Sequence, residues 1–130
     1  METDKLVESA RVCLPRAYAP YSGYSVAAAL LTTKGEVFNG VNVENASLGL
    51  TMCAERVAVA AAVTAGHRQF SRLAVVAEGE SPPFPCGACR QVLHEFAPNL
   101  QIIVASRDKE YQTFTLPELL PHTFEFNGKK

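Results

Sequence analysis

Apolar residues near the start of the chain recur at the spacing of an α-helix. The helical stripe consists of Leu6, Val7, Ala10, Cys13, Leu14 and Ala17. Thr3 or Asp4 stands where a capping side chain is expected, and Pro15 should end or bend the helix. A loop with Pro and Gly follows at residues 19–23, and the largely apolar run at 24–32 is typical of a buried strand. We interpret residues 33–36 as a hairpin turn into a second strand at 37–43.

The rest of the chain alternates helical patterns with short apolar strands. Residues 53–65 are rich in Ala and Val, and Gly66 follows where a helix C-cap belongs. A strand at 73–77, a stiff proline loop at 81–85 and a helix at 86–97 come next, the helix being stopped by Pro98. Strands at 101–105 and 111–115 and a short helix at 116–120 complete the pattern. This order predicts an α/β fold with helices packed on one mixed, five-stranded sheet.

The composition narrows the class of protein. With 130 residues, 48% of them hydrophobic, the chain is long enough for one domain over residues 1–130 and too short for two. Charged residues make up 19% and the net charge is −1, which argues against the basic face that nucleic acid binding needs. No apolar run approaches the ~20 residues of a membrane span, and the N-terminus has no secretory pattern. We therefore expect a cytoplasmic protein that binds neither nucleic acid nor membrane.

The four cysteines and their spacing indicate a metal site. In a reducing compartment they favour metal binding or burial over disulfides. Cys86 and Cys89 form a C-x-x-C pair at a predicted helix start, which places both sulfurs on one side of the helix. This pair alone fits zinc, a redox dithiol or plain packing. Cys53 and Glu55 favour zinc, because they add a third thiol and a carboxylate at the start of another predicted helix.

Three protein ligands are typical of a catalytic zinc ion, because the fourth tetrahedral position stays open for water. Glu55 is then placed to take a proton from that water and return it to a leaving group. A closed, structural site with Cys13 as fourth ligand is the alternative. Cys13 falls on the apolar stripe of the first helix, where a small buried hydrophobe is the simpler interpretation.

Three thiolates around one zinc ion leave a net charge of minus one, which opposes ionisation of the water. Cys53 and Cys86 lie at predicted helix N-termini, where the helix dipole favours a thiolate. Arg56 and Arg90 each follow a cysteine motif by one residue and are candidates for hydrogen bonds to the sulfurs. The alternative for either arginine is an ordinary surface charge.

Two motifs, Cys53-Ala54-Glu55-Arg56 and Pro85-Cys86-Gly87-Ala88-Cys89-Arg90-Gln91, resemble the signature of the small, homotetrameric, zinc-dependent cytidine deaminases. The resemblance extends over nearly the whole chain. It includes Ala19-Pro20-Tyr21-Ser22, Asn42-Val43-Glu44-Asn45, and Leu119-Leu120-Pro121 with Phe124. The family implies a three-layer α/β/α fold, one Zn²⁺ per chain on Cys53, Cys86 and Cys89, and a nucleoside as substrate. Glu55 then acts as acid and base without binding the metal.

The resemblance also implies how a nucleoside is held. Asn42 and Glu44 bind the ribose 3′-hydroxyl, Tyr24 stacks on the pyrimidine, and the backbone at Ala54 holds the edge of the base. Phe124 reaches the active site of a neighbouring subunit. The period of a strand places Asn42 and Glu44 on one face of an extended segment, which agrees with a shared task. Taken alone, Asn42 and Glu44 also fit a solvated strand end, and Tyr24 fits a sheet aromatic.

Three positions depart from the family. The family commonly has Phe where this chain has Tyr24, Gly where it has Ala27, and an aromatic residue where it has Leu48. Ala27 and Leu48 could alter pocket width or subunit contacts. The histidines, which are His67, His94 and His122, show no metal-ligand spacing with the cysteines and read as surface or packing residues.

The expected activity is hydrolytic deamination of cytidine and deoxycytidine, with release of ammonia. A blasticidin-type aminoacyl-nucleoside deaminase is an alternative with the same metal site. A polynucleotide editor is disfavoured, because no basic or aromatic tract is present to guide a single strand. A non-enzymatic zinc module is the alternative from another class, and Glu55 argues against it because a structural site has no use for a buried carboxylate.

Overall fold

In the part of the chain that the structure describes, five strands form a single sheet at the centre of the fold. The computed structural model describes residues 1–107 and 110–126. The strands are β1 (Val26–Thr32), β2 (Val37–Val41), β3 (Phe70–Ala77), β4 (Gln101–Ala105) and β5 (Tyr111–Thr115). Their order across the sheet is β2-β1-β3-β4-β5. Only β3 and β4 run parallel and the other neighbours are antiparallel, so the predicted mixed sheet is confirmed.

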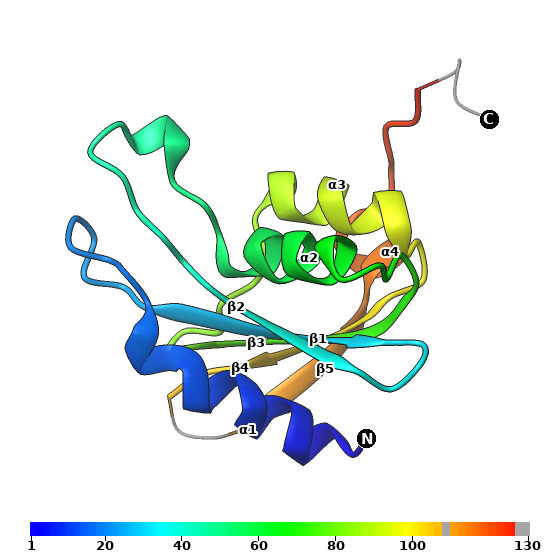
Figure 1. The fold of residues 1–130 in the computed structure, drawn as a ribbon, viewed down its shortest axis with the longest axis horizontal. Helices are drawn as coiled ribbons and strands as arrows, with labels where there is room; N and C mark the ends of the chain where they lie inside the picture. Colours follow the sequence, from blue (N-terminus) through cyan, green and yellow to red (C-terminus); the bar gives the residue numbers. More distant parts are fainter. Residues whose placement is uncertain (108–109, 127–130) are drawn as a thin grey trace.

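Helices cover both faces of this sheet. Helix α1 (Thr3–Cys13) packs on one face, and α2 (Ala54–Thr64), α3 (Gly87–Phe96) and α4 (Leu116–Leu119) lie on the other (Figure 1). The three-layer α/β/α architecture is therefore confirmed. Among the described residues, no helix has both the length and the apolar character needed to cross a membrane.

The central strands β1, β3 and β4 are largely apolar because both of their faces are buried, whereas the edge strand β5 is mostly exposed. On β1, Ala27, Ala29 and Leu31 face the cluster under α1. Ala28 and Leu30 face the opposite cluster, beneath α2 and α3. This alternation is the two-residue period of a strand, and it explains why the sequence reads as continuous apolar runs.

The first helix begins differently from the prediction. Glu2 is its N-cap residue, and no side chain caps the helix. Thr3 instead accepts a hydrogen bond from Arg72 on β3, and Asp4 accepts one from the hydroxyl of Tyr111 on β5. Both predicted caps are wrong because these side chains bind the sheet. The helix ends at Cys13, where the 3₁₀ turn η1 (Leu14–Arg16) contains Pro15.

Two strand ends lie inside the predicted ranges. β1 begins at Val26 and not at residue 24, and β2 ends at Val41 and not at residue 43. The amide of Asn42 accounts for both ends, since it accepts a hydrogen bond from Val26 N and donates one to Tyr24 O, at 3.0 and 2.8 Å. Beyond Val41 the chain leaves the sheet as an arm with the 3₁₀ turn η2 (Leu48–Leu50), which the sequence pattern did not indicate (Figure 1).

Gly40 allows α2 to approach β2 closely. A β-carbon at Gly40 would lie 2.5 Å from Ala58 N and still closer to Ala54 O. Any side chain there would therefore push the first turn of α2 away from the sheet. This contact fixes the position of the residues around the start of α2.

Candidate active site

Two helix N-termini bring the three predicted cysteine ligands together. Cys53 is the N-cap residue of α2, and Cys86 is the N-cap residue of α3. The sulfur of Cys86 accepts a hydrogen bond from the backbone N–H of Cys89 at 3.4 Å, which turns both thiols of the C-x-x-C pair to the same side. The three Sγ atoms lie within 4.8 Å of one another.

This spacing fits a zinc ion. Zn–S bonds of about 2.3 Å in a tetrahedron place the sulfurs roughly 3.8 Å apart. The Sγ atoms of Cys86 and Cys89 are 3.4 Å apart, and the whole group stays within 4.8 Å, so binding a metal needs only small side-chain movements. Cys13 is not part of the group, because it is the last residue of α1 and packs on the other face of the sheet.

The cluster is arranged to hold negative charge. A hydrogen bond from Cys89, together with the nearby Arg56, lowers the pKa of the Cys53 thiol to about 5, against the opposing effect of its burial. The same hydrogen bond to Cys53, followed by burial, raises the pKa of Cys89. Of these two thiols, Cys53 is therefore the stronger acid.

Arg56 provides the positive charge beside the sulfurs. Its Nη2 atom lies 3.7 Å from the sulfur of Cys53 and also donates to Thr51 O at 3.1 Å. Its buried Nε has no hydrogen-bond partner among the described residues. The free-energy cost of removing this group from water is therefore offset mainly by the negative charge of the neighbouring sulfur cluster.

Glu55 is the buried carboxylate of the site. Its side chain lies in the first turn of α2, and the residue is 5% exposed. Burial raises the pKa of Glu55 to about 7, and the negative charge of Cys53 acts in the same direction. A carboxyl group with this pKa can both accept and release a proton near neutrality.

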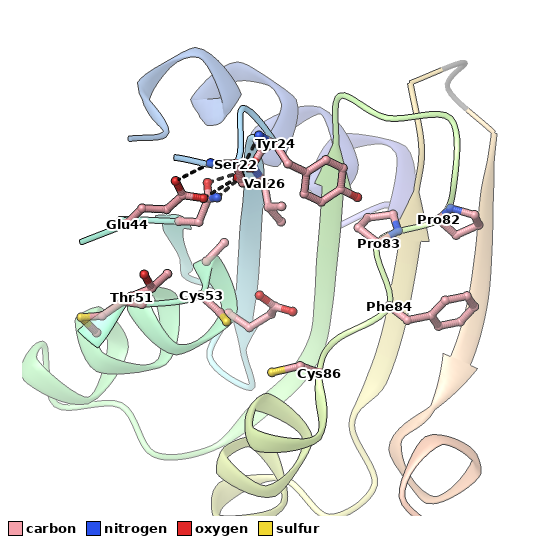
Figure 2. Close-up of a pocket in the computed structure, with 14 residues that line it drawn as sticks. Ser22, Tyr24, Val26, Glu44, Thr51, Cys53, Pro82, Pro83, Phe84 and Cys86 are labelled. Carbon is pink, nitrogen blue, oxygen red and sulfur yellow. Dashed lines mark hydrogen bonds between the residues drawn. The ribbon is translucent and has the colours of Figure 1, made fainter. Parts of the chain in front are cut away.

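A cavity of about 480 Å³ opens above these groups. Parts of four segments line it, namely residues 22–26, 42–44, 51–55 and 82–86. Figure 2 shows the ring of Tyr24 across the cavity from Cys86, with Pro83 and Phe84 along one side. The volume lies within the range for small-molecule sites.

Glu44 and Asn42 also line the cavity. One carboxylate oxygen of Glu44 accepts from the N–H groups of Tyr21 and Ser22, at 2.9 and 3.1 Å, and the other accepts from the Ser22 hydroxyl. The Ser22 hydrogen bond lowers the pKa of Glu44, which keeps it an ionised acceptor. Asn42 is 9% exposed and holds the backbone on either side of Ser25, as described above.

Comparison with known proteins identifies the family. The profile of the cytidine and deoxycytidylate deaminase zinc-binding region matches residues 1–105. The chain belongs to this deaminase family. It is therefore an enzyme, a hydrolase that acts on C–N bonds, and the resemblance seen in the sequence is confirmed.

Curated relatives match along almost their full length. The cytidine deaminase of Halalkalibacterium halodurans is 43% identical over 125 residues, covering 95% of this chain and 95% of the relative. The cytidine deaminase of Sporosarcina psychrophila is 41% identical over 125 residues, covering 95% and 92%. The crystal structure of cytidine deaminase from Burkholderia pseudomallei has a TM-score of 0.92 at 45% identity, and the match covers 95% of this chain and 100% of that chain.

Arg90 does not have the contact predicted for it. Its guanidinium donates to the backbone carbonyls of Pro85, at 2.7 Å, and Leu119. The prediction of a hydrogen bond to a sulfur is wrong, because the arginine points from α3 toward the end of α4. Arg90 thus ties the loop before α3 to α4.

Three further predicted positions lie away from the cavity. Ala27, where the deaminases commonly have Gly, faces the cluster under α1. Leu48 lies on the arm and is 70% exposed. Phe124 is also 70% exposed, and its carbonyl accepts from Gln91 Nε2 at 2.8 Å. The contact of Phe124 with a neighbouring subunit stays a prediction.

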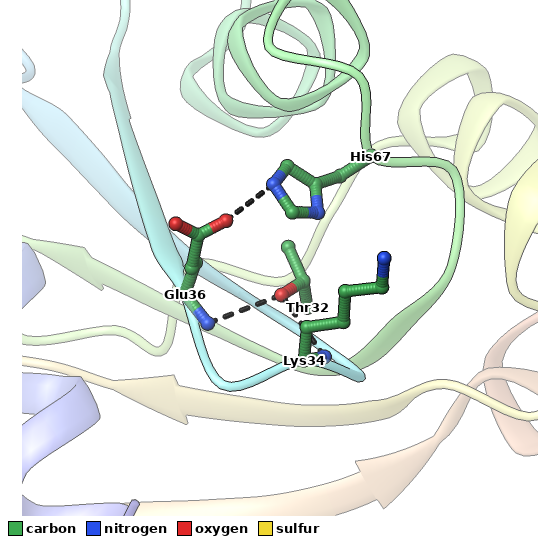
Figure 3. Close-up of polar contacts among 4 residues, drawn as sticks. All are labelled: Thr32, Lys34, Glu36 and His67. Carbon is green, nitrogen blue, oxygen red and sulfur yellow. Dashed lines mark hydrogen bonds and ion pairs between the residues drawn. The ribbon is translucent and has the colours of Figure 1, made fainter.

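The histidines have the packing roles expected of them where the structure gives a contact. His67 forms an ion pair with Glu36, whose N–H donates to the Thr32 hydroxyl (Figure 3). His94 pairs with Glu125 at 3.1 Å. Among the described residues, the metal-binding group contains cysteines alone.

Sequence analysis missed several residues that line the cavity. Ser22 orients Glu44, and Pro82, Pro83 and Phe84 form one side of the cavity. The proline-rich segment directly before Cys86 was a usable signal, since a stiff loop that leads into a metal ligand must lie near the metal. Ser22 gave no comparable signal apart from the family motif that contains it.

Proposed function

We propose that the protein hydrolyses the exocyclic amine of cytidine and deoxycytidine, giving uridine or deoxyuridine and ammonia. The observation that carries the proposal is the position of Glu55. It is a buried carboxyl group with a pKa near 7, two residues from Cys53, in the wall of a cavity that also contains Cys86. A zinc site that served only folding would not need such a group.

Cys53, Cys86 and Cys89 hold one zinc ion per chain as thiolates. When bound, zinc polarises a water molecule and lowers its pKa toward neutrality. Arg56 and the two helix N-termini stabilise the thiolates, so the sulfur cluster carries less uncompensated charge.

Glu55 moves the protons in this proposal. It accepts one proton from the attacking water and passes it to N3 of the cytosine as the oxygen bonds to C4. It then takes the second proton from that same oxygen and passes it to the amine, which leaves as ammonia when the C4–N bond breaks. Its burial supports the role, because the raised pKa reduces the cost of passing the proton on. The backbone at Ala54, next to Glu55 in the cavity wall, holds the edge of the base.

Other residues that line the cavity bind the rest of the nucleoside. Tyr24 stacks on the pyrimidine, and Asn42 and Glu44 bind the ribose 3′-hydroxyl. The side-chain amide of Asn42 uses one N–H and one oxygen lone pair in hydrogen bonds to the backbone. Its second N–H and second lone pair remain for the sugar. Ser22 and the nearby N–H groups fix Glu44 as a preorganised acceptor.

The chain works as one domain in pyrimidine salvage in the cytoplasm, as a homotetramer with Phe124 at a neighbour's active site. Exposed apolar side chains on the arm and the C-terminal segment support assembly. Leu48, Leu50, Phe124 and Phe126 are 67 to 70% exposed. Such apolar surface favours burial against another copy. Light scattering should give a tetramer, and an active monomer at micromolar concentration contradicts this part of the proposal.

A panel of substrates tests the activity. Ammonia release should be fast with cytidine and deoxycytidine and slow with cytosine, deoxycytidine monophosphate and blasticidin S. A preference for blasticidin S would identify the aminoacyl-nucleoside alternative. No release from any of the five would contradict the proposal.

A further inference from the structure

Gly79 lies against the edge of the Tyr24 ring, next to Cε1. A β-carbon at Gly79 would lie 3.0 Å from Cε1 of that ring, and 3.8 and 3.9 Å from Cδ1 and Cζ. Gly79 does not have the positive φ that Gly23, Gly35 and Gly66 have. Its backbone conformation is therefore open to any residue, and a β-carbon at this position can be accommodated only if the Tyr24 ring shifts.

The backbone of Gly79 is held so that it cannot retreat. The preceding N–H of Glu78 donates to Ser25 O at 3.3 Å, next to Tyr24 in the chain. On the other side, Arg107 donates from its backbone N–H to Gly79 O at 3.0 Å and from Nε to Glu78 O at 2.6 Å. Arg107 follows β4, so the segment is fixed to the sheet on both sides.

The Tyr24 ring is the part that can move. It is 39% exposed, and its hydroxyl has no hydrogen-bond partner among the described residues. The Tyr24 backbone is fixed by Ser22 Oγ and by Asn42 Nδ2, at 3.0 and 2.8 Å. A side chain added at position 79 would therefore displace the ring, which lines the cavity (Figure 2).

We propose that Gly79 is a positioning residue, held in place by Arg107, which sets how far the Tyr24 ring stands into the cavity. It thereby sets the width of the space for the pyrimidine. The inference rests on the proposed function, in which Tyr24 stacks on the base. The ring contacts the base in the ground state and in the transition state alike, so its displacement should change KM more than kcat.

The test uses a graded series in the zinc-loaded protein, Gly79→Ala and Gly79→Val. For cytidine, Gly79→Ala should raise KM about threefold to tenfold and Gly79→Val further, since small misplacements at a site are costly. The kcat should stay within about twofold, and zinc content should not change. Ser81→Ala, in the same loop and outside the cavity wall, is the control and should leave KM unchanged.

A double-mutant cycle separates positioning from a general effect on the loop. In a Tyr24→Ala background no ring remains to be displaced, so Gly79→Ala should not raise KM again. The same increase in both backgrounds would overturn the inference, as would an unchanged KM for Gly79→Ala in an active parent.

A crystal structure of Gly79→Ala provides a readout that needs no activity. The Tyr24 ring should be displaced away from position 79, and an unmoved ring overturns the inference. A parent protein without activity on cytidine contradicts the proposed function, while the position of the ring still decides the role of Gly79.

Discussion

Nη2 of Arg56 lies 3.7 Å from the sulfur of Cys53, three residues earlier in the chain, while the same atom donates to Thr51 O. One turn of helix thus places a permanent positive charge against a thiol whose pKa is lowered. The neighbouring Nε is buried without a hydrogen-bond partner among the described residues. Burying the guanidinium would therefore cost free energy if the sulfur cluster carried no negative charge.

Arg56→Gln should keep the fold and weaken the metal site. The loss of the positive charge raises the pKa of Cys53, so zinc has to displace more tightly held protons. We expect zinc affinity to fall about 10–100-fold, most strongly at low pH, and the acidic limb of the pH–rate profile to move to higher pH. Chelator competition across pH measures the affinity. Arg16→Gln, an exposed arginine on η1, is the control, and equal profiles for the two variants would show Arg56 to be irrelevant.

Cys13→Ser should leave zinc content unchanged, because Cys13 packs on the opposite face of the sheet from the other three cysteines. Cys89→Ser should lose most of the metal, since it removes a buried ligand. Metal analysis of the two purified variants compares them directly. Loss of zinc from Cys13→Ser would show that the site is not the open three-cysteine type.

Gly40→Ala should destabilise the protein through α2. The added methyl group would overlap with Ala54 O and Ala58 N, and both belong to a backbone that cannot yield cheaply. Overpacking of this kind costs about 1–3 kcal/mol, and the displaced helix start should also weaken zinc binding. Gly49→Ala is the control, because a β-carbon there meets nothing within 4 Å. Urea unfolding gives both free energies, and equal stability of the two variants would refute the close contact.

Glu55 should make the stability of the metal-free protein depend on pH. Burial raises its pKa from 4.5 to about 7 in the folded state, so between these values the folded chain holds more protons than the unfolded chain. Its contribution is fully present below about pH 4.5 and is lost as pH rises through about 7, amounting to about 3 kcal/mol at most.

Urea unfolding at pH 5 and pH 8 measures this effect. Relative to the parent, metal-free Glu55→Gln should gain unfolding free energy at pH 8. Because its pKa is lowered, Cys53 makes the unfolding free energy depend on pH in the opposite direction. Both proteins contain Cys53, so comparing them largely removes its contribution. A constant difference between parent and variant at the two pH values would contradict the raised pKa.

Local patterns predicted the parts of the site that depend on local structure. The helical patterns that follow Cys53 and Cys86 placed both residues at helix N-termini. Because Glu55 and Cys89 come only two and three residues later, each lies in the first turn of the same helix. The five strands and the mixed sheet followed from apolar runs and turn residues in the same way.

Errors arose where a side chain binds a distant part of the chain. Asn42 ends two strands through the backbone on either side of Ser25, and Arg90 binds Leu119, 29 residues away. The contact of Gly79 with the edge of the Tyr24 ring depends on tertiary packing as well. A sequence pattern does not show which residues far apart in the chain lie close together in the fold, so these contacts could not be predicted.

The central claim is that Glu55 carries protons for the hydrolysis of cytidine and does not bind the metal. Replacing it by Gln keeps the size and polarity of the side chain and removes the base. The most direct measurement is therefore the turnover of cytidine by Glu55→Gln, with zinc content determined on the same sample. Turnover should fall by ~10²–10⁴-fold or more, while zinc stays near one ion per chain. A variant that retains zinc and deaminates cytidine within about tenfold of the parent would contradict the account, as would one that loses its zinc.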